Sequence, residues 1–313
     1  LIQLNNEVNT HGKQTQFWGD IIESYPKLIP KLPKNMTALV WGYEGDFPFE
    51  KKLPKFKKAE IPFYVCPGTS SWRSLIGKNN NAFDNLRNAA IFGMKNKATG
   101  YLNTDWGDYG HWQPLSISYP TQLLGAQYAW NYKESAITHM DAQVNEVFFQ
   151  DSTGRLSQAL LKLGNAYQKA KIPEGNANVF HQMLHRFKWT LNGNAQTKVM
   201  NKEGLLAAEM EILSALDSMK YASPKVVDST IIMAEIQLAA ELALHGIHLG
   251  LARLEAKDQA TANIAPEVKQ ALIRELQPLI ERHKKLWIVR NRPGGLDDSA
   301  GKLKEILDYY KIP

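Results

Sequence analysis

The segment TALVWGYE, at residues 37–44, is a short apolar run that ends on aromatic and acidic side chains. Three further runs share this character: TQFWGDII at 15–22, PFYVCPG at 62–68 and ATGYLNTDW at 98–106. Each is rich in β-branched or aromatic residues and is bounded by Gly, Pro, Asp or Asn, which is typical of buried strands. The four runs therefore predict four β-strands.

The stretches between these runs are long enough to hold helices. Successive runs begin roughly 22 to 36 residues apart, which is the length of a βα unit. The segment at 82–98 has apolar residues at helical spacing and a basic end, so we expect it to be the crossover helix that parallel strands require. Strands that alternate with helices predict an α/β fold with a parallel sheet or barrel.

The second half of the chain has a different pattern, with long helical periodicity and almost no strand signal. Apolar residues recur at i, i+3, i+4 and i+7 in the ranges 157–170, 203–222, 228–256 and 266–292. Asp228 is the expected N-cap of the longest of these helices, and Pro266 suits the first turn of the last one. We therefore predict a β/α domain over 1–135 and an α-helical bundle over 136–313.

Composition excludes several classes of protein. The 313 residues have a net charge of +6, but the lysines gather at 51–58 on an expected solvated helix or loop, or alternate with acidic residues. Nucleic-acid binding would need a single basic face, so none is expected. No apolar run approaches the roughly 20 residues that cross a bilayer, so no membrane span is expected. We expect no cofactor, because GxGxxG, GxxxxGK[ST], HExxH and CxxC motifs are absent.

The remaining nucleophile and metal-ligand candidates are predicted to be structural. Cys66 precedes a Pro-Gly turn, which favours a buried small residue over a nucleophile. The pairs His181/His185 and His245/His248 have a spacing that metal ligands use on helices, but no carboxylate motif adjoins them, so structural or surface roles are favoured and no metal site is predicted. A single cysteine does not identify the compartment, for which we favour the periplasm or secretion.

Polar and aromatic side chains gather where the predicted strands end. In a parallel β/α barrel, active-site residues project from the carboxyl ends of the strands and from the loops that follow. Those positions hold Trp18, Asp20, Trp41, Tyr43, Glu44, Thr69, Ser70, Trp72, Asn103, Asp105, Trp106, Asp108, His111 and Trp112. Indoles stack on the CH faces of a pyranose, and carboxylates and amides bind its hydroxyl groups. This set therefore predicts a sugar-binding rim.

Packing explains some of these residues equally well. Trp18 fits a core position as readily as a binding site, and Glu44 fits a turn beside two glycines. Phe63 and Tyr64 point to opposite faces of one strand, so one of them is expected to be in the core. The DWGD sequence at 105–108 differs, because two carboxylates and an indole at one strand end are costly to bury without a purpose. We expect this segment to be functional.

Five segments together carry a resemblance to a known family. They are FWGDII (17–22), ALVWGYEG (38–45), FYVCPGTSSW (63–72), GYLNTDWGDYGHWQP (100–114) and LWIVRNRPGGLDDS (286–299). In this order they resemble the family 20 glycoside hydrolases, and most closely the bacterial enzymes with a helical C-terminal extension. The resemblance covers nearly the whole chain. It implies the C-terminal half of a (β/α)8 barrel, strands five to eight, followed by a helical domain.

The activity implied by the resemblance is that of an exo-acting β-N-acetylhexosaminidase, a hydrolase that releases terminal β-linked N-acetylglucosamine or N-acetylgalactosamine from a glycan. In that family a Glu is the acid/base, the substrate's own acetamido oxygen attacks the anomeric carbon, and a preceding Asp orients the acetamido group. By position, Trp18, Trp41 and Trp106 would wall the sugar pocket, and Asp108 would bind the outer hydroxyls. Tyr64 would donate to the acetamido carbonyl, although CPGTSSW departs from the commoner family form there.

The catalytic Asp-Glu pair of the family is absent from this sequence. The acid is therefore open, with Asp20, Glu44 and Asp105 as candidates. Residues 1–14 resemble the helix that would follow the missing strand. Four parallel strands leave two open edges, so we expect an upstream half to complete the barrel, or two copies to associate as a homodimer.

Two further hypotheses remain beside an active hexosaminidase. The chain is either a non-catalytic carbohydrate-binding half-barrel, or a hydrolase that uses a different acid, drawn from Glu7, Asp20, Glu44, Asp105 and Asp108. In the helical half, Trp287 and residues 290–292 are expected either to contact the barrel or to fill core and surface positions.

Overall fold

The structure is a computed structural model that describes residues 1–133, 138–173 and 175–312. The chain forms two compact units. Unit 1 comprises Leu1–Thr69, Asn80–Thr104 and Thr121–Ile137, and unit 2 comprises Ser70–Asn79, Asp105–Pro120 and Thr138–Pro313. The predicted domain boundary, between 135 and 136, lies outside the described residues. Two loop segments from the first half of the chain, 70–79 and 105–120, belong to the mostly helical unit 2.

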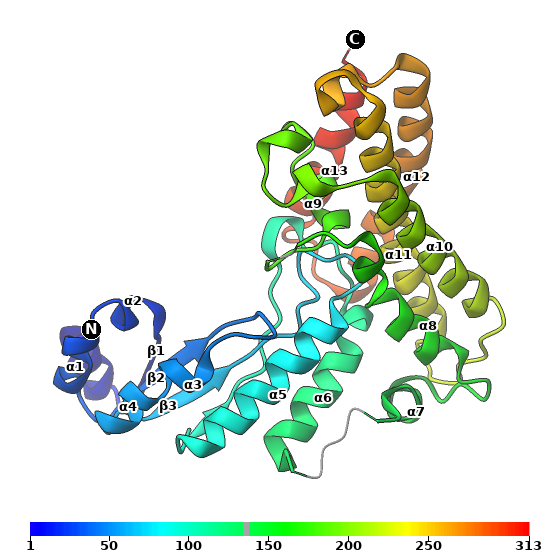
Figure 1. The fold of residues 1–313 in the computed structure, drawn as a ribbon. Helices are drawn as coiled ribbons and strands as arrows, with labels where there is room; N and C mark the ends of the chain where they lie inside the picture. The colour runs from blue at the N-terminus through cyan, green and yellow to red at the C-terminus, as the bar shows by residue number, and fades with distance from the viewer. Residues whose placement is uncertain (134–137, 174, 313) are drawn as a thin grey trace. The chain divides into compact units, whose positions relative to one another are not determined.

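Unit 1 is built on a parallel sheet (Figure 1). Its strands are β1 (Thr15–Trp18), β2 (Met36–Trp41), β3 (Phe63–Cys66) and β4 (Gly100–Tyr101), in the order β1-β2-β3-β4. All neighbouring strands are parallel. The four predicted strands and the α/β class are therefore confirmed. The last strand is the shortest, and its pairing resumes only at an isolated bridge between Gly68 and Thr104.

Helices precede, connect and follow the strands of unit 1. They are α1 (Ile2–Thr10), α2 (Asp20–Glu23), η1 (Pro26–Lys31), α3 (Phe49–Lys52), α4 (Pro54–Lys58), α5 (Asn79–Lys95) and α6 (Tyr119–Asn131). Helix α5 confirms the crossover helix predicted at 82–98. The lysine cluster lies on α3 and α4, as predicted, with Lys51, Lys57 and Lys58 exposed, while Lys52 and Lys55 pair with Glu23.

The two faces of the sheet have different surroundings. On one face, Ala38, Val40, Phe63 and Val65 pack with apolar residues of α3, α4 and α5 in a buried core. Side chains alternate along a strand, so residues one position away point to the opposite face. Trp18, Leu39 and Tyr64 occupy one row of that opposite face, because they are register partners on neighbouring strands. Phe63 is thus the core member of its pair, as one of the two was expected to be.

Unit 2 consists mainly of helices. Its longer helices are α8 (Arg155–Leu163), α9 (Val179–His185), α10 (Lys202–Met219), α11 (Ser229–Glu255), α12 (Pro266–Arg290) and α13 (Leu296–Tyr310). Its short helices include η2 (Asp108–Gly110), η3 (Leu115–Ser118), α7 (Met140–Val144), the π-helix η4 (Asn145–Phe149) and η5 (Ala166–Ala170). The four predicted helices are confirmed, except that the pattern at 157–170 divides at Gly164 into α8 and η5. Pro266 opens α12 as predicted.

Helix α11 forms the centre of unit 2 and contacts α9, α10 and α12. It approaches α9 closely at Gly246, where a Cβ atom would lie 2.5 Å from the carbonyl oxygen of Phe180. The sequence predicts no membrane span, whereas α11 is long and apolar enough to cross a membrane by length and composition. Two thirds of its apolar window (67%) is nevertheless buried in the protein, and the core helix of a globular domain has the same composition. We therefore describe α11 as a core helix.

Candidate functional site

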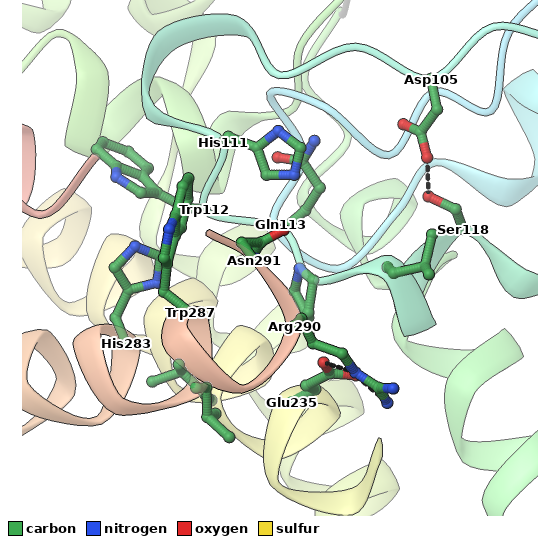
Figure 2. A pocket seen from close by; sticks show the side chains of 14 residues that line it. Asp105, His111, Trp112, Gln113, Ser118, Glu235, His283, Trp287, Arg290 and Asn291 are labelled. Carbon is green, nitrogen blue, oxygen red and sulfur yellow. Dashed lines mark hydrogen bonds and ion pairs between the residues drawn. The ribbon is translucent and has the colours of Figure 1, made fainter. Parts of the chain in front are cut away.

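Unit 2 contains a cavity of about 340 Å³ between the segment that follows β4 and the helices α11 and α12 (Figure 2). We call it the Trp287 cavity. Its walls are formed by Asp105, His111, Trp112, Gln113, Pro114, Leu115, Ser118, Glu235, Leu238, His283, Leu286, Trp287, Arg290 and Asn291. Three of the predicted strand-end residues, Asp105, His111 and Trp112, line it. It also joins two of the five resemblance segments, 100–114 and 286–299.

Two indoles give the cavity its aromatic character. Trp287 is half-buried, and its Nε1 donates a hydrogen bond to the Arg292 carbonyl oxygen at 2.9 Å. The rings of His111 and His283 stand edge-on to it, with centroids 5.9 and 5.8 Å away. Trp112 is buried (4% exposed). An indole held at its nitrogen and edges has a fixed plane, which is what stacking on a flat apolar ligand face requires.

The backbone of the segment at 109–111 is strained. Tyr109, Gly110 and His111 all have positive φ, at 57°, 120° and 51°. For the two residues that are not glycine, this conformation costs of order 1–3 kcal/mol each and persists only when the surroundings enforce it. At Gly110 a Cβ atom would lie 2.6 Å from the Trp112 Nε1, so only glycine fits there.

Ser299, in the first turn of α13, holds this segment in place. Its hydroxyl donates to the Gly110 carbonyl oxygen and also lies 2.8 Å from Nε2 of His283. Its own carbonyl oxygen accepts from Trp112 Nε1 at 3.1 Å. One serine therefore connects the strained segment, an indole of the cavity and helix α12.

Asp105 is a fixed hydrogen-bond acceptor at the opposite end of the lining (Figure 2). Its Oδ1 accepts from the Ser71 hydroxyl at 2.6 Å, and its Oδ2 accepts from the Ser118 hydroxyl at 2.5 Å. These bonds fix the orientation of the carboxylate. A carboxylate whose two oxygens already accept hydrogen bonds is better suited to position a ligand hydroxyl than to donate a proton.

An ion pair between Arg290 and Glu235 forms another part of the cavity wall. Arg290 Nε donates to Glu235 Oε1 at 2.8 Å, and its Nη1 lies 2.7 Å from Asp228 Oδ2. The hydrogen bond to Glu235, which is 1% exposed, raises the pKa of Arg290 above its usual value. The predicted N-cap position of α11 is confirmed at Asp228. The residue stands at the N-cap of α11, but its side chain makes no capping hydrogen bond and pairs with Arg290 instead.

His283 is a neutral imidazole at neutral pH. Burial, and secondarily the charge of His111, lower its pKa to about 4. Because the Ser299 hydroxyl donates its proton to Gly110, Nε2 of the neutral His283 donates to the Ser299 oxygen and brings no charge into the buried end of the cavity. His283 therefore adds no charge to a lining that already holds Asp105 and the Arg290–Glu235 pair.

The structure places the other predicted rim residues of unit 1 along the sheet. Trp18 (40% exposed) ends β1 and Trp41 ends β2, and Trp41 stacks on the buried Tyr43 with ring centroids 5.2 Å apart. Tyr64 lies against Gly100, where a Cβ atom would be 2.5 Å from its ring. Trp18, Trp41 and Tyr64 share the face opposite the core, since the residues of one face alternate along each strand.

The polar rim residues of unit 1 differ in burial and in their contacts. Asn103 Nδ2 donates to the Thr121 carbonyl oxygen at 3.1 Å, while its Oδ1 is buried and has no hydrogen-bond partner among the described residues. Asp20 is exposed at the start of α2, and Glu44 is half-buried in the loop after β2. Glu7, on α1, is exposed and pairs with His11 at 3.4 Å.

The rim residues that belong to unit 2 divide between core and surface. Trp72 is buried (1% exposed), which is the burial of a core residue rather than of an open stacking platform. Trp106 is 36% exposed, and its carbonyl oxygen accepts from Gln113 Nε2 at 2.8 Å. Asp108 is half-buried at the first position of η2. Of the predicted strand-end residues, Asp105, His111 and Trp112 line the Trp287 cavity.

A row of asparagines on α5 positions the loops of unit 1 and was not predicted. Asn81 Nδ2 donates to the Tyr43 carbonyl oxygen at 2.7 Å, and Asn88 Nδ2 donates to that of Gly45 at 2.7 Å. Asn85, between them, bonds to the loops after both β2 and β3. Asparagine is a poor helix former, so three of them at i, i+4 and i+7 are a signal that sequence reasoning could have used.

Cys66 and the histidine pairs have structural surroundings. Burial raises the pKa of the Cys66 thiol to about 12, and the residue is fully buried, which confirms the predicted small core residue. His245 and His248 bond to Glu275, a carboxylate from a different helix. No group of three or more His, Cys, Asp or Glu side chains within residues 1–133, 138–173 and 175–312 is arranged to hold a metal ion.

Comparison with known proteins gives no further assignment. No family model matches the chain, and none of the curated proteins matches its sequence. The resemblance to family 20 glycoside hydrolases therefore stays a prediction from the five segments quoted above.

Proposed function

We propose that this chain binds a terminal N-acetylhexosamine residue of a glycan and acts as the sugar-binding part of a β-N-acetylhexosaminidase. The observation that carries the proposal is the Trp287 cavity, which combines indoles of fixed orientation with a fixed carboxylate, Asp105. Its volume of about 340 Å³ lies at the small end of the range for ligand sites, where a monosaccharide belongs.

The chemistry of a pyranose matches these groups. Its apolar CH face stacks on an indole, for which Trp287 is the half-buried candidate. Its hydroxyl groups donate to carboxylates, for which Asp105 is already oriented by Ser71 and Ser118.

The proposed reaction is the retaining, substrate-assisted hydrolysis described for the family, in which the acetamido oxygen of the sugar attacks its own anomeric carbon. The hydrogen bonds to Asp105 support a positioning role for this residue. Asp20 and Glu44 therefore remain the candidates for the acid within this sequence. The absence of an Asp-Glu pair favours a second candidate function, a non-catalytic carbohydrate-binding half-barrel.

Calorimetric titration with N-acetylglucosamine tests the sugar site. The variant Trp287→Ala is expected to weaken binding about tenfold or more, equivalent to about 1.4 kcal/mol, because the stacking platform is removed. Trp130→Ala is the matched control, since Trp130 is a 92% exposed tryptophan of α6 that does not line the cavity. Equal affinity in the wild type and Trp287→Ala would refute the proposed site.

A chromogenic β-N-acetylhexosaminide separates the two candidate functions. Cleavage that is inhibited by an N-acetylglucosamine-thiazoline, and abolished by Asp20→Asn or Glu44→Gln while binding survives, supports the enzyme. Binding of the sugar without any cleavage by these 313 residues supports the carbohydrate-binding half-barrel. Absence of both binding and cleavage contradicts both candidates.

We also propose that the sheet of unit 1 is the second half of a (β/α)8 barrel. Within the described residues, β1 pairs only with β2 and β4 only with β3, so both edges of the sheet lack a neighbouring strand. Edges of this kind favour pairing with another chain. Size-exclusion chromatography with light scattering on this chain is expected to show a homodimer, and a stable monomer would contradict the homodimer.

A further inference from the structure

A second cavity of unit 2, of about 180 Å³, has a different chemical character from the first. It lies between the end of α9, the residues 187–189 that follow it, and α13. We call it the basic cavity, and its polar and indole lining residues are Trp112, His185, Lys188, Trp189, Lys302 and Glu305. Trp112 is a wall of both cavities.

Positive charge predominates around the basic cavity. Lys188 and Lys302 lie in its lining, and the lining carboxylate, Glu305, is a loose partner of Lys188 with an N–O separation of 3.9 Å. This positive charge affects the pKa of the His185 imidazole. Burial, followed by the positive charges of Arg73, Arg186 and Lys302, lowers its pKa to about 4.

The two arginines near His185 are held on aromatic rings rather than on carboxylates. The guanidinium of Arg73 lies 4.7 Å from the ring centre of Tyr109, and that of Arg186 lies 4.9 Å from the ring of Trp189. Nε of Arg73 is buried without a hydrogen-bond partner among the described residues. Cation–π contacts fix a cation without neutralising its charge, so these groups keep their attraction for an anion.

We propose that the basic cavity binds an oxyanion, namely a sulfate, phosphate or carboxylate group, either as a free ion or as the acidic substituent of a sugar. The lysine ammonium groups are the charge-assisted donors, and the neutral imidazole of His185 contributes a further N–H. The small volume suits a single anionic group. The mouth is exposed at Lys188 and Lys302, so the attraction is sensitive to salt.

Titration with sodium sulfate at constant ionic strength tests the proposal, with tryptophan fluorescence as the readout because Trp189 lines the cavity. The wild type is expected to show saturable binding, and Lys302→Ala is expected to weaken it at least about fivefold, or about 1 kcal/mol. Lys304→Ala is the matched control. It removes the same charge from the same helix, at an exposed lysine that pairs with Asp308 outside the cavity.

Two results would overturn the oxyanion site. One is the absence of saturation in the wild type, and the other is an equal loss in Lys304→Ala and Lys302→Ala, which would indicate only a general effect of net charge. The variant Trp287→Ala is expected to bind sulfate as the wild type does. A failure of the sugar site can thus be distinguished from a failure of the oxyanion site.

Two further ligands distinguish the sources of the oxyanion. N-acetylglucosamine 6-sulfate and inorganic sulfate are compared on the wild type and on Lys302→Ala. Tighter binding of the sulfated sugar, lost in Lys302→Ala, assigns the oxyanion to an acidic glycan. Equal binding of both assigns it to a free ion. If Lys302→Ala binds both ligands as tightly as the wild type does, the proposed site is contradicted.

Discussion

Replacement of Asn85 with leucine is expected to lower the free energy of unfolding by about 3 kcal/mol or more. The side chain is fully buried, and its Oδ1 accepts from the Gly68 N–H at 3.1 Å. Its Nδ2 donates to the carbonyl oxygens of Gly42 and Glu44, at 2.8 and 2.9 Å. Leucine has nearly the same size but leaves all three backbone groups without these partners in a place that water does not reach.

Urea unfolding followed by circular dichroism measures this effect. Asn88→Leu is the matched comparison, because Asn88 is half-buried on the same helix and donates one hydrogen bond, to the Gly45 carbonyl oxygen. We expect its loss to be about 1 kcal/mol. Equal losses in the two variants would show that the backbone groups around Asn85 find other partners.

The variant Glu275→Gln is expected to reduce the stability of unit 2 by about 2 kcal/mol at pH 6, allowing for its partial exposure. Glu275 accepts from His248 Nδ1 at 2.7 Å and from His245 Nδ1 at 3.0 Å. The chain of hydrogen bonds continues from His248 Nε2 to Glu209 at 2.9 Å, and from His245 Nε2 to the Tyr310 hydroxyl at 3.1 Å. Neutralising the central carboxylate weakens both imidazole contacts.

The effect depends on pH in a direction that the pKa values define. The hydrogen bond to Glu275 raises the pKa of His248 from 6.5 to about 9, so its contribution is present below pH 6.5 and is lost as the pH rises through 9. Burial opposes ionisation of Glu275, but the bonds from both histidines outweigh it and lower its pKa from 4.5 to about 2. That contribution is present above pH 4.5 and is lost as the pH falls towards 2.

The difference in stability between the wild type and Glu275→Gln is therefore expected to be largest between pH 4.5 and 6.5 and to narrow above pH 9. Urea titrations at pH 6 and 9.5 measure it. The pKa values of His181, His185 and His283 are lowered in the wild type and in the variant alike. Their contributions therefore cancel in the stability difference. Glu281→Gln, on an exposed residue of α12 that pairs with Lys284, serves as the control. A stability difference that does not change with pH would show that His248 is not protonated at pH 6.

Local pattern was sufficient to predict the strands and most of the long helices. Each strand of unit 1 is a short apolar run, and α10, α11 and α12 repeat apolar residues at helical spacing, so neighbouring residues alone identify them. The short α9 and the polar α13 lack such a long pattern and were not predicted. Asp228 was given a local role as a cap, although its partner Arg290 lies 62 positions along the chain.

The site was predictable only in part, because its contacts join distant segments. The strand-end pattern identified Asp105 and His111, but the indole and the serine that complete their surroundings, Trp287 and Ser299, come from the last two helices. The carboxylate that binds His245 and His248 likewise comes from another helix. Sequence spacing reveals partners within one element, whereas tertiary packing determines partners between elements.

The position of Trp112 as a wall of both cavities has a thermodynamic consequence. If both cavities bind the ligands proposed for them, a ligand that displaces this indole in one cavity would change the shape of the other and so link the two binding equilibria. Such linkage is reciprocal: whatever factor an anion in the basic cavity applies to sugar affinity, the sugar applies to the affinity for the anion. Because Trp112 donates to the Ser299 carbonyl oxygen, a displacement of the indole would also act on the first turn of α13.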